Sequence, residues 1–446
     1  MSNFETTDNV TDKVNGTHDA ALRSWVTSAN ETGTDFPIQN LPFAVFRDRW
    51  SRGEFRIGVA IGDQILDLRA VSAAGLLGHA KHHADLLTGV CSEPDLTGLM
   101  KAGADSWTAL RSALSTLLRE GSASADVMTA MLIPQANAEF GMPTRVGDFT
   151  DFFASVHHAR RTGALSRPDN PLLPNYHWVP IAYHGRSSSI RVSGCDVKRP
   201  SGQVKLPADA APTFRKSARL DYESELGFFV GPGNALGEPI ALDDAGRHIF
   251  GVCLLNDWSA RDIQGWEAQP LGPFLAKNFA TVISPWIATW EALQPFRTEW
   301  KRDVPAPLSY LDSASNTARG ALDIGLGVWI ETARMRQVGT GLERLSRTNA
   351  VHSHWTLAQM LTHHSSNGCN LMPGDLIGTG TQSGPTLEEA GCMLELSEGG
   401  KRAIVLKNAE ERRFLEDGDR VVLTGRCERS GARSIGFGEC SGLVTP

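Results

Sequence analysis

The segment DYESELGFFV, residues 221–230, combines closely spaced carboxylates with an apolar run. Apolar residues fill its second half, which predicts a strand entering a core. Residues i and i+2 of a strand face the same side about 6.6 Å apart, so Glu223 and Glu225 project together. Two such charges repel by roughly 2.5 kcal/mol at an effective dielectric of about 20, and a divalent cation removes that cost. The alternative is a solvated strand edge with two exposed glutamates.

Two other segments place acids beside apolar runs. In LLNDWSARD, Asp257 precedes Arg261 and Asp262, and in GDFTDFF, Asp148 and Asp151 precede an aromatic pair. Strand ends often carry ligands, because the scaffold there is rigid and the tip is open. Turns and helix caps are the alternative, since aspartate is frequent in both.

Lys277 lies in the apolar context PFLAKNF. A buried lysine is unusual unless it is paired, which favours a functional role for this side chain. The sequence has no G-x-S-x-G, H-E-x-x-H or G-x-x-x-x-G-K-[ST] motif. These absences argue against a serine hydrolase, a zinc protease and a P-loop nucleotidase.

Bulk properties exclude several classes of partner. The 446 residues carry a net charge of -7, which argues against nucleic acid or anionic lipid as a partner. No apolar run is long enough to span a bilayer. The seven cysteines are scattered, without a C-x-x-C, as is typical of reduced thiols in a cytoplasmic protein. Residues 1–34 are polar and lack an apolar signal core, so we expect a disordered tail.

The elements that must position these side chains change in character along the chain. Residues 35–68 contain short alternating apolar segments, which predict a small β-module. Residues 70–138 have helical periodicity, and the Pro-containing segments MLIPQ and GMPTR predict a linker before Asp148. From there on, short strands and turn residues alternate, including HIFGVCLLNDWS and RVVLTGRC, which predicts a large β-rich domain. The expected class is mainly β with α (α+β).

Longer motifs resemble those of the fumarylacetoacetate hydrolase family. They are DFTDFFASVHHARRTG, LLPNYHWVPIAYHGRSSSI, DYESELGFFVGPGN, NDWSARDIQGWE, PLGPFLAKNFAT, LTHHSSNGCNLMPGDLIGTGTQSGP and SIGFGEC. The resemblance implies an SH3-like β-barrel domain over residues 35–140 and a catalytic domain over residues 141–446. It also implies a homodimer that needs Mg²⁺ or Ca²⁺, with Mn²⁺ also suited. The implied reaction is hydrolysis of 4-fumarylacetoacetate to fumarate and acetoacetate, the last step of tyrosine and phenylalanine breakdown.

The resemblance also implies roles for individual residues. Implied metal ligands are Asp151, Glu223, Glu225 and Asp257, with a second cation site at Asp257, Lys277 and Thr281. Implied catalytic residues are His158 as the base, Glu395 as its partner, and Arg261, Gln264 and Lys277 around the reacting centre. Implied substrate contacts are Phe153, Arg167, Tyr183, Gln264 and Thr381.

These roles are consistent with hydrolysis of a carbon–carbon bond. A neutral imidazole at His158 can take a proton from water, and Glu395 can orient the ring. Arg261, Lys277 and Gln264 can donate to the oxyanion that forms. Plainer alternatives exist: a surface histidine pair at 157–158, an Arg261 that only bridges Asp257 or Asp262, and an edge acid at Glu395 in a strand-like run.

Two positions depart from the family pattern. Phe153 and Ala268 stand where the family usually has substrate-contacting tyrosines. Missing hydroxyls alter discrimination among substrates, so a related acylpyruvate or 2,4-dioxo acid is an alternative substrate. Other reactions on the same fold, such as oxaloacetate decarboxylation or isomerisation of dienoate acids, are further alternatives. A catalytically silent binding protein is the alternative from a different functional class.

Overall fold

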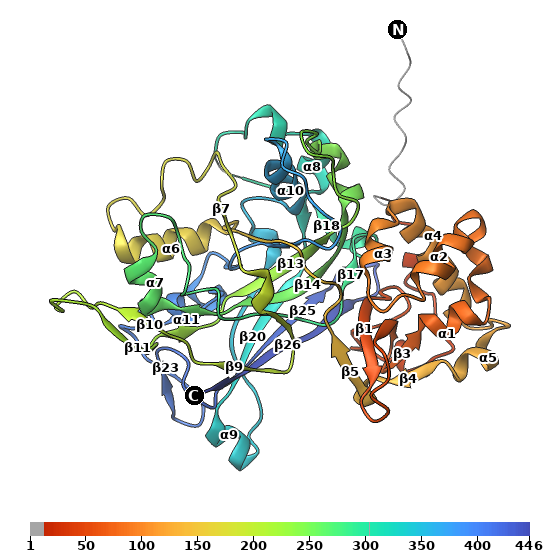
Figure 1. Ribbon diagram of the computed structural model, residues 1–446, viewed down its shortest axis with the longest axis horizontal. Coiled ribbons are helices and arrows are strands. Elements are labelled where there is room, and N and C mark those ends of the chain that lie inside the picture. The colour runs from red at the N-terminus through yellow and green to blue at the C-terminus, as the bar shows by residue number, and fades with distance from the viewer. Residues whose placement is uncertain (1–12, 303) are drawn as a thin grey trace, which may run out of the picture.

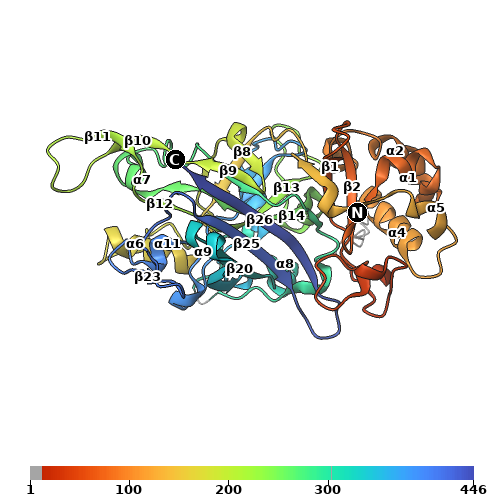
Figure 2. The same ribbon diagram turned by 90° about the horizontal axis from the view of Figure 1, so that it is seen from below.

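The structure, a computed structural model, describes residues 13–302 and 304–446 (Figure 1). An N-terminal domain rich in helices lies at one end of the elongated molecule, and a larger β-rich domain forms the rest (Figures 1 and 2). The expected α+β class, with a small β-domain before a large one, is confirmed.

The N-terminal domain is built on a five-stranded antiparallel sheet. Its order is β4 (Leu132–Pro134), β3 (Gln64–Asp67), β2 (Arg56–Ile61), β1 (Phe43–Asp48) and β5 (Ala138–Gly141). Five helices accompany it: α1 (Leu68–Ala73), α2 (Ala84–Val90), α3 (Thr97–Lys101), α4 (Ala104–Leu118) and α5 (Ala125–Thr129). Helix α4 buries Leu110, Leu114 and Leu117, which recur at the three- and four-residue spacing of one helix face.

Two expectations about this half of the chain are wrong. The predicted linker MLIPQ forms β4, so the chain returns to the N-terminal sheet before it enters the second domain. Residues 13–34 are ordered, with buried side chains at His18, Val26 and Ala29. His18 Nε2 lies 2.8 Å from the carbonyl oxygen of Glu291, and Asn15 Nδ2 donates to Glu291 Oε1 at 2.7 Å. The polar composition of this segment predicted disorder, but hydrogen bonds from its polar side chains to Glu291 hold it in place. Residues 1–12 of the expected tail lie outside the described residues.

An eight-stranded mixed sheet forms the first layer of the large domain. Its order is β7 (Ala182–His184), β6 (Phe149–Phe152), β22 (Leu376–Gly378), β13 (Ser224–Val230), β14 (Ile249–Asp257), β16 (Thr281–Ile283) and β8 (Ile190–Val192), with β17 (Ala288–Thr289) beside β14. The strands predicted from ELGFFV and HIFGVCLLND are β13 and β14, and every residue in both is buried.

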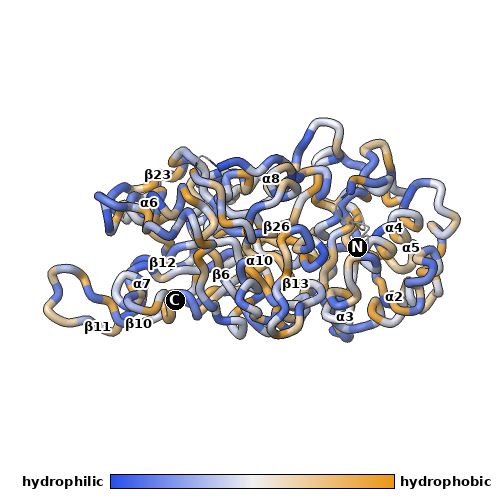
Figure 3. Tube along the Cα trace, turned by 90° about the horizontal axis from the view of Figure 1, so that it is seen from above, coloured by the Kyte–Doolittle hydropathy of each residue, from blue (hydrophilic) through white to orange (hydrophobic). Residues whose placement is uncertain are grey.

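A five-stranded sheet packs against the first one. Its order is β21 (Glu343–Asn349), β20 (Gly325–Glu331), β25 (Arg420–Cys427), β26 (Ile435–Thr445) and β9 (Cys195–Lys198). Leu254, Leu423 and Phe437 belong to the shared core between the two sheets. A Cβ at Gly425 would lie 2.7 Å from Leu254 Cδ2, so the backbone of β25 approaches β14 closely. Apolar residues accordingly concentrate inside the molecule (Figure 3).

Short helices and hairpins complete the large domain. The helices are α6 (Val156–Ser166), α7 (Arg261–Glu267), α8 (Ala314–Arg319), α9 (Ala333–Val338), α10 (Leu357–Ser365) and α11 (Met393–Leu396). The short strand pairs are β10 (Ser201–Val204) with β11 (Thr213–Lys216), β12 (Leu220–Asp221) with β15 (Ser259–Ala260), β18 (Arg297–Thr298) with β19 (Ala321–Leu322), and β23 (Ile404–Val405) with β24 (Glu411–Arg412). Helices α6, α7 and α11 gather at the end remote from the N-terminal domain (Figures 1 and 2).

Candidate active site

Neighbouring strands of the eight-stranded sheet bring four acids to one edge. Asp151 lies on β6, Glu225 on β13 with Glu223 just before it, and Asp257 ends β14. β22 runs parallel to β6 and antiparallel to β13, which runs antiparallel to β14, so the end of β6, the start of β13 and the end of β14 meet. A carboxylate oxygen from each acid lies within 4.8 Å of one from every other. All four are buried, which rules out the solvated strand edge.

Two cations balance part of this negative charge. Lys277 is buried and donates to Glu223 and, at 2.7 Å, to Asp257. Arg261 Nη1 lies 2.6 Å from Glu223 Oε1. Burial opposes ionisation of Glu223, but Lys277 and Arg261 outweigh it and lower the pKa of this carboxyl. The pairing expected of a buried lysine is therefore present.

The other side of the cluster lacks such compensation. Burial, followed by repulsion from neighbouring carboxylates, raises the pKa of Asp151 and of Glu225 well above the usual range. Glu225 Oε1 is buried without a hydrogen-bond partner in residues 13–302 and 304–446. An orphaned carboxylate oxygen among three other acids is suited to a hard divalent cation, so the residues present fit the expected metal.

The backbone of the segment after β22 encloses the acids closely. The Gly380 N–H donates to Asp151 Oδ1 at 3.1 Å and to Glu225 Oε2 at 3.0 Å. A Cβ at Gly378 would lie 2.5 Å from Asp151 Oδ1 and 3.2 Å from Glu225 Oε2. Glycine at 378 therefore leaves the space that these carboxylates occupy.

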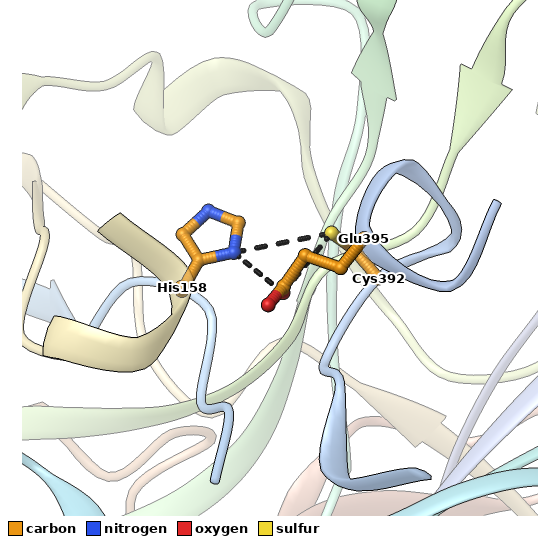
Figure 4. A group of neighbouring side chains, drawn as sticks. All are labelled: His158, Cys392 and Glu395. Carbon is orange, nitrogen blue, oxygen red and sulfur yellow. Dashed lines mark hydrogen bonds and ion pairs between the residues drawn. The ribbon is translucent and has the colours of Figure 1, made fainter. Parts of the chain in front are cut away.

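The expected histidine–glutamate pair forms across 237 residues of sequence. His158 lies in the first turn of α6, and its N–H donates to the capping Ser155 Oγ at 3.3 Å. His158 Nδ1 is 2.7 Å from Glu395 Oε1, and both side chains are buried (Figure 4). Glu395 lies on helix α11 rather than in a strand, so its interpretation as an edge acid is wrong.

Several side chains that the sequence did not single out hold Glu395. Arg161 Nη1 donates to Glu395 Oε2 at 2.8 Å, Ser383 Oγ to Oε1 at 2.7 Å, and Cys392 Sγ lies 3.4 Å from Oε1. Burial would raise the pKa of Glu395, but the charge of His158 and the hydrogen bonds from His158, Ser383 and Arg161 lower it to about 2. Helical spacing could have identified Arg161, since it follows His158 by three residues and shares its helix face.

Arg261 does not bridge Asp257 or Asp262, as the structural alternative proposed. Its Nε donates to Asp221 Oδ2 at 2.9 Å, and Asp221 also accepts from the N–H groups of Met393 and Leu394 in α11. Asp221 thereby joins the arginine to the helix that carries Glu395. Arg261 Nη2 is buried without a partner among the described residues, so it can bind a ligand.

Asp262 has a purely local role. It accepts from Ser217 Oγ at 2.5 Å and from Ala218 N–H at 2.8 Å. These bonds fix the segment that precedes β12, and they leave Asp262 outside the acid cluster.

A cavity of about 680 Å³ opens onto this chemistry. Its lining includes Asp151, Phe153, His158, Arg167, Tyr183, Glu223, Arg261, Gln264, Ala268, Lys277 and Thr381. The Tyr183 hydroxyl donates to Asp257 Oδ2 at 2.7 Å, and Arg261 Nη1 to Gln264 Oε1 at 3.2 Å. Thr381 Oγ1 is buried without a partner in the described part of the chain, so it can bind a ligand atom.

Both departures from the family pattern face this cavity. The Phe153 ring packs edge-on against the His158 imidazole, with the ring centroids 5.3 Å apart. Ala268 lies at the C-terminus of α7. The pocket therefore has an apolar contact beside His158 and an alanine methyl where two phenols were expected.

The side chains expected at a second cation site act as donors to Asp257. Thr281 Oγ1 donates to Asp257 Oδ1 at 2.9 Å, and the Lys277 ammonium donates to Oδ2. An ammonium has no lone pair, so the Lys277 side chain cannot bind a cation. The only ligand atom that Lys277 could offer to a cation here is its backbone carbonyl oxygen.

Comparisons with known proteins agree with this architecture. The family model described as fumarylacetoacetase N-terminal matches residues 39–143, and fumarylacetoacetate (FAA) hydrolase C-terminal matches residues 149–445. The fumarylacetoacetase of Oryza sativa subsp. japonica is 46% identical over 437 residues, covering 95% of this chain and 97% of the relative. That of Bos taurus is 45% identical over 418 residues, covering 93% and 97%. A solved fumarylacetoacetate hydrolase of Exiguobacterium antarcticum has a TM-score of 0.50 at 16% identity, covering 91% of this chain and 99% of that chain.

Proposed function

The chain belongs to the fumarylacetoacetate hydrolase family, and we propose that it hydrolyses the carbon–carbon bond of 4-fumarylacetoacetate to give fumarate and acetoacetate. The observation that carries the proposal is the meeting of a buried His158–Glu395 pair and a buried four-acid cluster around one cavity. The His158–Glu395 pair can transfer a proton, and the four-acid cluster is suited to a cation that binds ketone oxygens.

His158 is the proposed general base. Its Nδ1 is engaged by Glu395, which leaves the Nε2 lone pair of the neutral ring to accept a proton from water. Glu395 stabilises the imidazolium that results, and Arg161 and Ser383 keep the carboxylate oriented. The water oxygen then adds to the carbonyl carbon of the acyl group.

The proposed oxyanion donors are Arg261, Lys277 and the Gln264 amide. The unpartnered Arg261 Nη2 faces no competing acceptor in the described structure, so it can bind the developing charge without breaking another bond. A divalent cation, when held by Asp151, Glu223, Glu225 and Asp257, supplies Lewis acidity toward the diketo oxygens. The bond between this acyl carbon and the methylene carbon that separates the two ketones then breaks. The methylene carbon leaves as the enolate of acetoacetate, and His158 can return its proton to that carbon.

Substrate turnover and metal dependence together test this proposal. Purified protein stripped with a chelator should lose activity on fumarylacetoacetate and regain it with Mg²⁺, Ca²⁺ or Mn²⁺. The same cations should raise the melting temperature, because a ligand that binds only the folded state stabilises it by about 2.7 kcal/mol at a hundred times its Kd. Full activity in excess chelator would overturn the metal role, and no turnover with any of the three cations would overturn the activity.

Phe153 and Ala268 favour a second candidate, hydrolysis of a related 2,4-dioxo acid or acylpyruvate. Fewer hydroxyls in the pocket leave fewer polar groups that must be matched by the substrate. An acylpyruvate assayed beside fumarylacetoacetate separates the two candidates. A higher kcat/KM for the acylpyruvate would replace the first candidate with the second.

We also propose a homodimer located in the cytoplasm. Exposed apolar side chains at Phe214, Trp266, Leu271 and Phe274 lie on the elements around α7 and the β10–β11 hairpin, and a second copy would cover them. All seven cysteines are free, which suits a reducing compartment. No helix among the described residues is long and apolar enough to cross a membrane. A monomeric mass in light scattering would contradict the dimer.

A further inference from the structure

The mouth of the active-site cavity carries exposed charge of one sign. Arg167, Arg219 and Lys401 line the cavity and are exposed, and we call these three residues the cationic rim. The two acids in the lining, Asp151 and Glu223, are buried at the metal cluster. Among the described residues, the exposed charged groups of the cavity lining are therefore all cationic.

Arg219 and Lys401 are held on the same wall by Phe414. The Arg219 guanidinium carbon lies 5.7 Å from the centroid of the Phe414 ring. A Cβ at Gly400 would lie 2.9 Å from Phe414 Cε2, so the backbone next to Lys401 packs on the same ring. This shared contact places both side chains beside one opening.

The turn that carries Lys401 is anchored to the catalytic helix. Glu398, Gly399 and Gly400 have φ values of 49°, 74° and 86°, which reverse the chain directly after α11. The Gly399 N–H donates to the Leu394 carbonyl at 2.8 Å, and the Arg402 N–H to the Ser397 carbonyl at 2.9 Å. Lys401 is therefore fixed relative to Glu395, six residues earlier.

Arg167 lies at the C-terminus of α6, beside the turn that carries Lys401, since a Cβ at Gly399 would lie 3.3 Å from Leu165 Cδ2. Its Nη2 donates to the Pro171 carbonyl at 3.4 Å, and the residue lines the cavity together with Arg219 and Lys401. No ion pair of Arg219 or Lys401 occurs within residues 13–302 and 304–446, and both cations are free to bind an anion.

We propose that Arg219 and Lys401 complete an anion subsite with Arg167, which binds the second carboxylate of a diketo dicarboxylate. This inference rests on the proposed function and names the substrate class that its site selects. Fumarylacetoacetate carries a carboxylate at each end, and the end remote from the acid cluster reaches the cationic rim. Three cations around one opening can make charge-assisted hydrogen bonds to that carboxylate.

A pair of substrates tests the subsite. Fumarylacetoacetate has two carboxylates, whereas 3,5-dioxohexanoate has the same diketo acid end and a methyl group in place of the carboxyvinyl group. In the double variant Arg219→Gln/Lys401→Gln we expect KM for fumarylacetoacetate to rise about tenfold, with kcat within about twofold of wild type. KM for 3,5-dioxohexanoate should change by less than about twofold, because that substrate leaves the cationic rim unused.

The matched control is Arg160→Gln, which removes an exposed arginine of α6 that does not line the cavity. It should leave both KM values unchanged. Added salt should raise the wild-type KM for fumarylacetoacetate and have a smaller effect on the double variant. An unchanged KM ratio between the two substrates in the double variant would overturn the subsite alone. Wild-type protein that hydrolyses neither substrate would overturn the proposed function, and the subsite with it.

Discussion

At the scale of single residues, the site depends on buried groups that satisfy one another. Glu395 accepts a hydrogen bond from Arg161 at Oε2 and one from Ser383 at Oε1, the oxygen that also pairs with His158. Removing one partner from such a buried set costs more than one neutral hydrogen bond, because a charge loses compensation. Residue substitutions in this set should therefore have large and specific effects.

The His158–Glu395 pair can be tested by nearly isosteric changes. His158→Asn removes the base, and Glu395→Gln removes the charge that stabilises an imidazolium. Each should lower kcat on fumarylacetoacetate by about 10²- to 10⁴-fold, with a smaller effect on KM.

The neighbouring His157 provides the control for this prediction. It lies outside the pair and packs against His352, with ring centroids 5.9 Å apart. His157→Asn should keep kcat within about twofold. Equal losses in the His157 and His158 variants, with unchanged melting temperatures, would contradict the assignment of the base.

At the scale of elements, strand register places the acids. Asp151 pairs with Gly378 on β22, and Gly378 pairs in turn with Gly227 on β13. A Cβ at Gly378 would meet the carboxylates of Asp151 and Glu225, whereas a Cβ at Gly227 would meet Leu255 and Leu376. The space that the acids need is therefore supplied by Gly378, a residue that carries no chemistry itself.

Gly378→Ala tests this role of the backbone. Its Cβ would lie 2.5 Å from Asp151 Oδ1, so the carboxylate must move. We expect cation affinity, measured by isothermal titration calorimetry, to fall at least about tenfold while the far-ultraviolet circular dichroism stays native. Gly89→Ala, at a position where a Cβ meets open space, is the control. Unchanged affinity in Gly378→Ala would show that the acids have more freedom than the structure indicates.

At the scale of the whole molecule, the segment 13–34 links the two domains. Asn15 and His18 both bind Glu291 of the large domain. Between them, Thr17 Oγ1 accepts a hydrogen bond at 2.8 Å from Arg111 of α4 in the N-terminal domain. Burial, with the nearby Arg111 charge, lowers the pKa of His18 from 6.5 to about 4. The folded protein therefore favours the neutral form of the His18 ring.

This linkage predicts a loss of stability in acid. The unfolded chain binds a proton at His18 below about pH 6.5 and the folded chain only near pH 4, so the contribution is complete above 6.5 and is lost as the pH falls between these values. Within this window the free energy of unfolding should fall by about 1.4 kcal/mol per pH unit from this group alone.

Urea unfolding of His18→Gln at several pH values measures the contribution. The slope of stability against pH between about 6 and 4.5 should be shallower in this variant by about that amount, and the exposed His82→Gln should match wild type. Identical slopes in all three proteins would show that segment 13–34 does not hold His18 in its neutral form.

The sequence by itself determined the parts that depend on local pattern. Alternating and continuous apolar runs predicted β13 and β14, and the spacing of Glu223 and Glu225 predicted that their side chains would project together. Long motifs predicted the family, and the structure brings together the expected His158 and Glu395. Helix α11 was missed because four residues are too few to show helical periodicity, and its capping by Asp221 comes from a distant segment.

Only the tertiary structure decided how charge is compensated. The sequence places Asp221, Arg161 and Ser383 far from Glu395 or gives them no distinguishing context, yet in the fold they position the His158–Glu395 pair. Burial decided that the acids form an enclosed cluster rather than a solvated edge, because the cost of a buried charge depends on neighbours from other strands. The cationic rim likewise exists only because the end of α6, the turn after α11 and the segment before β12 meet at one cavity.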